Sequence, residues 1–122
     1  MSFQFDPTRP IYLQIMEEVK KRSVRGQYVS GGQAPSVREM AGEMGVNPNT
    51  IARAYMELER EGFLFTKRGQ GSFVTEAGDR IEAERRGLAS AAMDRFVSEV
   101  RELEMNADQI RGLLDRLKEA LV

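Results

Sequence analysis

The amino-acid sequence predicts a mostly helical α+β protein, and three observations lead to this fold class. Apolar residues recur at helical spacing along most of the chain. Residues 63–74 instead have the composition of two short strands joined by a glycine-containing turn. From about residue 79 the chain is charged, poor in loop-forming residues and helical in its periodicity. We therefore expect a globular domain over residues 1–75, followed by a helical region over residues 76–122.

Composition limits the functions open to this chain. With 122 residues, of which 41% are hydrophobic and 30% charged, it can bury one modest core and an appended element. It contains neither cysteine nor histidine, which removes disulfides, the usual ligands of zinc, the imidazole base and the thiolate nucleophile. We therefore expect neither an enzyme nor a protein that carries a metal or another cofactor.

The distribution of charge and hydropathy along the chain indicates whether a polyanion or a membrane is a partner. Residues 1–75 contain ten lysines and arginines against eight acidic residues, whereas residues 76–122 contain eight against eleven, so a polyanion would favour the first part. The N-terminus carries no basic segment followed by an apolar run, and nowhere do about 18 apolar residues follow one another. We expect a cytoplasmic protein that has no membrane partner.

A first helix is predicted over residues 11–25, because Pro10 suits a first helical turn and apolar residues recur after it. The next stretch, residues 26–35, contains three glycines and a proline and is predicted as a loop, with a short strand at residues 28–29 as an alternative. The apolar face of this first helix, over residues 11–25, includes Ile11, Ile15 and Val19.

A helix-turn-helix is predicted after this loop. Ser36 and Glu39 are spaced as a capping box, so a short helix over residues 37–44 should follow. Asn47 is a favoured N-cap and Pro48 a favoured first helical residue, so another helix begins only a few residues later. Two short helices joined by so tight a turn are a helix-turn-helix. The buried face of the second of them comprises Ile51, Ala54, Tyr55 and Leu58.

A β-hairpin is predicted directly after the helix-turn-helix. Residues 63–66 and 72–74 form its strands, and Gly69 and Gly71 can supply the positive φ angles that a tight turn requires. This hairpin is the wing of a winged helix-turn-helix.

Two helices are predicted in the C-terminal region, one ending near residue 104 and the other, capped by Asn106, ending near residue 121. Because a single pair of helices cannot cover the apolar stripe of each, we expect an identical pair from a second chain to cover them. This two-helix C-terminal dimerisation hairpin would make the protein a homodimer. The predicted dimerisation residues are Leu88, Ala92, Phe96, Leu103, Ile110, Leu113, Leu114, Leu117 and Leu121.

Polar residues at the start of the second helix of the helix-turn-helix predict contact with double-stranded DNA. In such a motif this helix enters the major groove with its N-terminus first, so side chains of its first turn meet base edges. Asn49 and Thr50 are placed for bases or phosphates, and Arg53, one turn later, for a guanine. Asn47 has two alternatives, which are contact with DNA and its capping role alone.

Three further features have both a DNA-binding and a structural interpretation. Ser36 can cap its helix and still contact a phosphate. Arg38 faces away from the apolar side of its helix and is either a ligand of DNA or a solvated surface arginine. Lys67 and Arg68 lie at the tip of the hairpin, where they either reach a minor groove or keep an exposed hairpin soluble.

Residues 35–74 of this chain have the sequence PSVREMAGEMGVNPNTIARAYMELEREGFLFTKRGQGSFV. This stretch closely resembles the DNA-binding domain of the GntR family of bacterial transcriptional regulators. The preceding segment of this chain, PIYLQIMEEVKKRSVRGQY, resembles the family's first helix, so the likeness covers residues 10–75. The short helical C-terminus and the NPNT at the start of the recognition helix resemble the YtrA subfamily, whose tail serves mainly for dimerisation. The resemblance implies a homodimer that binds a palindromic DNA operator, commonly as a repressor.

The resemblance also assigns functional positions. Ala52 stands where many members have an arginine that reads guanine, so this contact is either missing or transferred to Arg53. The family's DNA-binding positions fall on Arg38, Asn47, Asn49, Thr50 and, at the tip of the wing, on Gly69 or Gly71.

We therefore expect a sequence-specific transcriptional regulator, a homodimer whose two winged domains bind half-sites about one helical turn apart. The alternative is a winged-helix protein-protein interaction module without sequence-specific DNA binding, with which the net charge of −1 agrees. The clustering of polar and basic residues where DNA would lie favours the regulator. An unknown small-molecule effector would bind between the domains or at the dimer interface.

Overall fold

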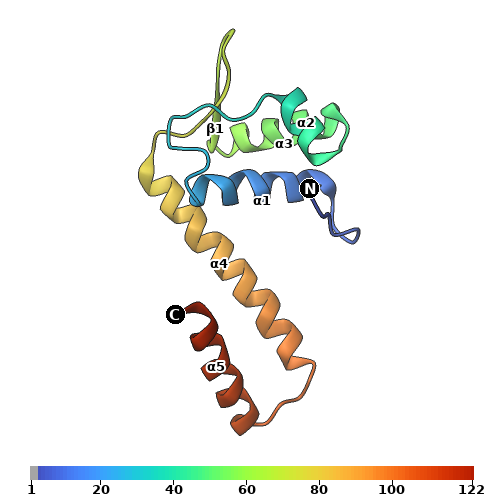
Figure 1. Ribbon diagram of the computed structural model, residues 1–122, viewed down its shortest axis with the longest axis vertical. Coiled ribbons are helices and arrows are strands. Elements are labelled where there is room, and N and C mark those ends of the chain that lie inside the picture. The colour runs from blue at the N-terminus through green and yellow to red at the C-terminus, as the bar shows by residue number, and fades with distance from the viewer. Residues whose placement is uncertain (1–2) are drawn as a thin grey trace. The chain divides into compact units, whose positions relative to one another are not determined.

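The computed structural model describes residues 3–122, which form five helices and one two-stranded antiparallel sheet. The mostly helical α+β class and the predicted order of elements are confirmed. Two compact units make up the chain, an N-terminal unit, Met1–Leu88, and a C-terminal unit, Ala89–Val122. In Figure 1 the elements are α1 (Ile11–Val24), α2 (Val37–Met44), α3 (Pro48–Arg60), β1 (Leu64–Lys67), β2 (Gly71–Val74), α4 (Gly78–Arg101) and α5 (Ala107–Leu121).

The helix-turn-helix forms from the local signals that the sequence carries. The Ser36 hydroxyl accepts a hydrogen bond from the Glu39 N–H at 3.0 Å, and the Glu39 carboxylate accepts from the Ser36 N–H at 3.1 Å, so the capping box of α2 is confirmed. Hydrogen bonding with Ser36 holds the pKa of Glu39 below its ordinary value, and the backbone N–H of Ser36 contributes more than its hydroxyl. Gly45 ends α2 in the left-handed region at a φ of 69°, and the Asn47 side chain caps α3 by accepting from the Asn49 N–H at 2.8 Å.

The wing consists of β1 and β2, paired in register from Leu64 opposite Val74 to Lys67 opposite Gly71. Gly69 and Gly71 have φ angles of 78° and 105°, so the predicted positive values are confirmed. The alternative of a strand at residues 28–29 is wrong. The extended pairing lies at Gln33 instead, which forms a bridge with Phe73 because this part of the loop runs along β2.

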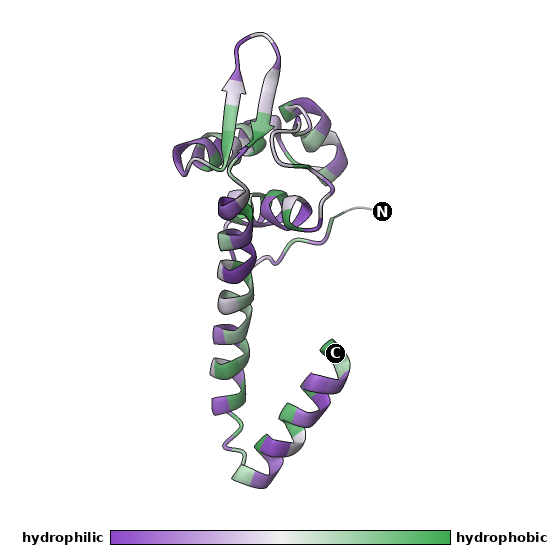
Figure 2. Cartoon of the chain, turned by 90° about the vertical axis from the view of Figure 1, so that its left-hand side faces the viewer, coloured by the Kyte–Doolittle hydropathy of each residue, from purple (hydrophilic) through white to green (hydrophobic). Residues whose placement is uncertain are grey.

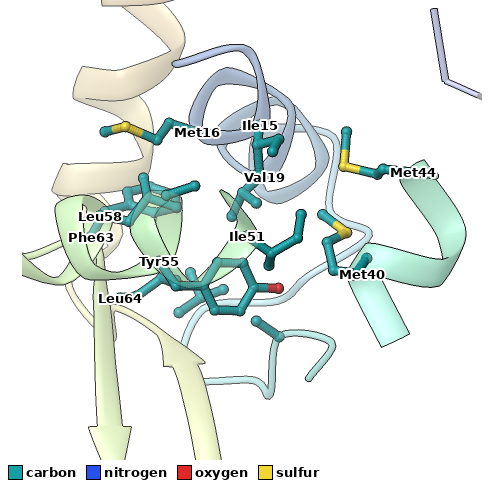
Figure 3. Close-up of a cluster of buried hydrophobic side chains, with 14 residues drawn as sticks. Ile15, Met16, Val19, Met40, Met44, Ile51, Tyr55, Leu58, Phe63 and Leu64 are labelled. Atoms are coloured by element: carbon teal, nitrogen blue, oxygen red, sulfur yellow. The ribbon is translucent and has the colours of Figure 1, made fainter. Parts of the chain in front are cut away.

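The core of the N-terminal unit lies between α1, α2, α3 and the base of the wing (Figure 3). The four residues predicted for the buried face of α3 are all buried, and Phe63 closes the core with no exposed surface. The Tyr55 hydroxyl donates to the Pro35 carbonyl oxygen at 2.7 Å, and burial raises the pKa of this phenol. The largest fully buried side chains are Phe63, Ile15, Met40, Ile51, Leu58, Val19 and Val74.

The first turns of α4 belong to the N-terminal unit and are fastened to it by charged side chains. Arg80 donates a hydrogen bond from Nη1 to the Glu61 carbonyl oxygen at 2.6 Å. The Lys20 Nζ lies 2.9 Å from a carboxylate oxygen of Glu61 and 3.3 Å from one of Glu84. Helix α4 therefore starts from a defined place on α1 and α3, held by these polar contacts and by Ile81, which packs against the core.

The C-terminal unit has well-formed helices and no buried side chain. A second capping box, between Asn106 and Gln109, begins α5 as the sequence predicted for Asn106. None of the residues of α4 and α5 is buried, although hydrophobic positions recur along both helices (Figure 2). Helix α4 ends at Arg101, earlier than the predicted end near residue 104, because the chain turns here and Glu104 has a φ of 49°. Leu103 therefore lies in the turn and not on the helical stripe.

Candidate nucleic-acid interface

The first turn of α3 presents polar side chains at the surface. Asn47 and Asn49 are exposed, and Thr50 is half-buried. The Asn47 side-chain oxygen is already engaged as the N-cap, whereas the Asn49 side chain remains open to the surroundings. Three of the predicted DNA-binding residues therefore occupy one exposed helix end.

Arg53 follows one turn later and has an aromatic partner that sequence reasoning missed. Its guanidinium carbon lies 3.8 Å from the centroid of the Tyr12 ring, which comes from α1. This distance is typical of a stacked cation–π pair. An open hollow between α1 and α3 is lined by Pro10, Ile11, Tyr12, Asn49, Thr50 and Arg53.

Helix α2 contributes Ser36 and Arg38, both exposed. The Ser36 hydroxyl serves the capping box, as described above. Within residues 3–122, the Arg38 guanidinium forms neither an ion pair nor a hydrogen bond, so its donors are available to an anion. Helix α2 is itself held by Arg22 of α1, which lies 2.7 Å from a carboxylate oxygen of Glu43.

Arg22 lies in a largely enclosed cluster of charges, where its side chain and that of Glu18 are each 12% exposed. Its guanidinium also donates to Glu18 at 2.8 Å and to the Tyr28 hydroxyl at 2.8 Å. Burial alone would lower the pKa of Arg22, but these hydrogen bonds outweigh it and raise the pKa above its ordinary value. Arg22 therefore stays charged and fixes the position of α2, the helix that carries Arg38.

The wing carries Lys67 over an aromatic pair and Arg68 at its tip. Phe65 and Phe73 face each other across the two strands, with ring centroids 5.8 Å apart and an interplanar angle of 25°. The Lys67 ammonium lies 4.4 Å from the centroid of the Phe73 ring, whereas Arg68 is exposed at the tip. Both views show the hairpin projecting beyond the helices of its unit (Figures 1 and 2). A cation at this projecting tip can approach a polyanion without obstruction by the rest of the domain.

The turn of the wing is held by a residue from the loop before α2. Gln33 donates from Nε2 to the Gln70 carbonyl oxygen at 2.6 Å. A Cβ atom on Gly71 would lie 3.2 Å from the same nitrogen, so glycine is favoured there by space as well as by its φ angle. Sequence reasoning missed Gln33, because its contact depends on a loop that returns to β2 from 37 residues away.

The part of the chain that the structure describes offers neither a cluster of metal ligands nor a membrane-spanning helix. Between residues 3 and 122, no group of three or more acidic side chains is placed to hold a metal ion. None of the helices in that range combines the length and the apolar character that a membrane crossing requires.

These features together define a winged helix-turn-helix domain of the DNA-binding class, with an exposed polar recognition helix and a basic wing. The family model described as bacterial regulatory proteins, gntR family, matches residues 11–74. The chain belongs to the GntR family, as the sequence resemblance suggested, and is a DNA-binding transcriptional regulator.

Relatives extend the likeness beyond the winged domain. The HTH-type transcriptional regulator YhcF of Bacillus subtilis is 40% identical over 110 residues, which are 90% of this chain and 91% of YhcF. The HTH-type transcriptional repressor YtrA of the same organism is 45% identical over 75 residues, which are 60% of this chain and 58% of YtrA. These relatives are named as regulators of transcription.

Solved structures show the same architecture. A GntR family transcriptional regulator from Listeria monocytogenes matches with a TM-score of 0.81 and 38% identity, over 92% of this chain and 98% of that one. The DNA-binding domain of AraR, in complex with operator ORX1, matches with a TM-score of 0.56 and 26% identity, over 62% of this chain and 95% of that one.

Proposed function

We propose that this regulator binds a two-fold symmetric operator as a homodimer and represses transcription by occupying it. Its two winged domains contact half-sites about one helical turn apart. A bacterial regulator that binds the chromosome works in the cytoplasm, and this location is part of the proposal. The observation that carries the proposal is the open apolar face of α5, in a chain whose other unit is built to bind DNA.

The leucines of α5 support pairing between two chains. Leu114, Leu117 and Leu121 are 54%, 39% and 78% exposed in the single chain. An amphipathic helix in water gains free energy when such a stripe is covered by another surface. An apolar hollow of about 390 Å³ lies beside this stripe, lined mainly by Phe96, Val97, Val100, Met105, Ile110, Leu113 and Leu114. Two-fold pairing sets the same surface of each chain against its partner, so the leucines of one chain can fill the hollow of the other.

The DNA contacts belong to the winged domain. Helix α3 enters the major groove, where Asn49 and Thr50 meet bases or phosphates. Arg38 of α2 contacts a base or a phosphate beside them, while Lys67 and Arg68 reach a minor groove with the wing. The AraR domain, which resembles this unit and is bound to an operator, supports this arrangement. Family membership favours it over the protein-protein interaction module.

Repression is supported by the relatives. YtrA, which is 45% identical over 75 residues, is named a transcriptional repressor. A bound dimer represses in the simplest way when its operator overlaps a promoter, because RNA polymerase and the dimer then compete for the same DNA.

Selection of bound duplexes from a random DNA pool tests the proposal most directly. We expect the recovered sequences to be two-fold symmetric, with half-sites about 10 base pairs apart between their centres. Sedimentation of the complex should give two chains per duplex. In transcription reactions with purified RNA polymerase, a promoter that overlaps the recovered site should be silenced by the full chain.

Each part of the proposal has its own failing outcome. Asymmetric recovered sequences with one chain per duplex would contradict the homodimer on a palindrome. Increased transcription from the overlapping promoter would contradict repression. Binding of duplexes without any sequence preference would contradict an operator altogether.

A further inference from the structure

The stacked pair of Tyr12 and Arg53 leaves a specific part of the arginine available. A guanidinium that stacks on a ring uses its flat face, so its N–H donors still point outward in the plane of the group. Within the described residues 3–122, no carboxylate forms an ion pair with Arg53. The ring therefore holds a cation whose donors are not consumed by the protein.

The surroundings of this cation suit an anion. Asn49 lies one helical turn before Arg53 on the exposed face of α3, and Thr50 lines the same hollow. An amide N–H₂, a hydroxyl and a guanidinium are all donors that bind phosphate oxygens in complexes with DNA. No acidic residue is among the six that line the hollow, so nothing there repels a phosphate.

The direction of Arg53 decides between a base and a phosphate. A side chain that reads a base must extend from the recognition helix toward the floor of the major groove, which is about 8.5 Å deep. Arg53 is instead held sideways against α1, at the flank of α3. The flanks of a helix in the groove face the two phosphate backbones rather than the base edges.

We propose that Tyr12 positions the Arg53 guanidinium to bind a phosphate of the DNA backbone in the hollow between α1 and α3. Asn49 and Thr50 complete the phosphate site. Arg53 then does not replace the guanine-reading arginine that Ala52 lacks, and Tyr12 is a positioning residue outside the helix-turn-helix. This inference rests on the proposed operator binding and adds to it the role of one arginine and its partner.

The test measures duplex binding at several salt concentrations with the full chain. Two duplexes of equal length are used, one recovered by selection with the wild type and one with its sequence scrambled. Arg53→Ala should weaken binding to both by a similar factor, about tenfold, and lower the slope of log affinity against log salt by about 1. Tyr12→Phe keeps the ring and should leave both affinities unchanged. Tyr12→Leu should weaken both duplexes, and should add little when combined with Arg53→Ala.

A second measurement does not depend on how well the Tyr12→Leu variant folds. Single phosphates of the recovered duplex are replaced in turn by neutral methylphosphonates. At one position in each half-site, the replacement should weaken the wild type clearly more than it weakens Arg53→Ala, because both changes remove the Arg53 contact whereas Asn49 and Thr50 are present in both proteins.

The outcomes separate this inference from the proposed function. A loss with Arg53→Ala that is confined to the selected duplex would make Arg53 a base reader. Full affinity in a folded Tyr12→Leu variant, or no coupled phosphate in the methylphosphonate series, would overturn the inference while operator binding stands. If selection recovers no operator, a duplex of arbitrary sequence and the same length still shows, from the salt dependence of its binding to the wild type and to Arg53→Ala, whether Arg53 contributes one phosphate contact.

Discussion

The two units of this chain use similar local signals and reach opposite results. Helix α2 begins with the Ser36 and Glu39 capping box, and α5 begins with the equivalent box of Asn106 and Gln109. Helix α2 then buries three residues in a shared core, whereas α5 buries none. The difference shows that capping and periodicity are sufficient to specify a helix, but burial requires a second surface.

The source of that surface differs between the units. In the N-terminal unit, α1, α3 and the wing supply it from the same chain. In the C-terminal unit, the leucines remain open, and we propose that a second chain covers them. Variants that affect one unit and not the other test this contrast.

The largest effect on the stability of a single chain is expected from Phe63→Ala in the core of the N-terminal unit. Phe63 is fully buried, and removal of a buried phenyl ring costs about 3–5 kcal/mol of the free energy of unfolding. Chemical denaturation of the full chain measures the loss. Sedimentation should show an unchanged oligomeric state in conditions where the variant stays folded. Dissociation there would show that the two units do not stabilise themselves separately.

A charge in the open stripe should separate the chains. Each leucine buried in a dimer contributes about 1.5–3 kcal/mol, so Leu114→Asp together with Leu117→Asp should yield monomers by sedimentation. The N-terminal unit should keep its unfolding transition, because neither residue belongs to its core. The matched control is Glu119→Lys, which lies on the opposite face of α5 and should leave the dimer intact. A dimer that survives the double substitution would refute pairing through this face.

Arg38→Ala should cost about 1–3 kcal/mol of operator binding, because its unpaired guanidinium is expected to reach a base or a phosphate. Lys67→Ala should instead mainly reduce the dependence of operator affinity on salt concentration. Gel shifts at several salt concentrations distinguish the two. Arg111→Ala in the C-terminal unit is the control and should bind as the wild type does. Unchanged affinity in the Arg38 variant would remove this residue from the interface.

The two capping boxes allow a direct comparison of the units. Ser36→Ala should lower the free energy of unfolding by about 1 kcal/mol, a usual value for the loss of an N-cap. Asn106→Ala should act differently, by weakening the dimer rather than the N-terminal unit. Thermal unfolding of both variants over a range of protein concentrations measures this. If the Ser36→Ala loss depended on concentration as the Asn106→Ala loss does, the contrast between the units would not hold.

Acid should weaken one box and spare the other, with the smallest effect of the five. The pKa of Glu39 is lowered in the folded chain, so its contribution is complete above its ordinary value of 4.5 and is lost as the pH falls through the lowered pKa. Gln109 does not titrate and should hold its cap throughout. The measurement compares the melting temperatures of the wild type and Glu39→Gln from about pH 7 to about pH 3. A difference between them that stays constant over this range would contradict the assignment.

Sequence reasoning succeeded where a few neighbouring residues decide the outcome. The box at Ser36, the N-cap at Asn47 and the positive φ angles of Gly69 and Gly71 all follow from residues close in the chain. It failed at residues 28–29, because the extended pairing of this loop with β2 depends on packing between distant segments. It also failed at Leu103, because the chain turns after the end of α4.

Local sequence is sufficient to specify the helices, the hairpin and the residues of the apolar faces, since helix caps, periodicity and glycine conformations are local properties. Which side chains meet across elements depends on the folded arrangement of the chain. The Tyr12 ring under Arg53, the Gln33 amide on the wing and the Arg22 site between α1 and α2 all join residues far apart in the chain. Such contacts depend on how whole elements pack, and neither the spacing nor the type of a residue reveals which distant partner it will contact.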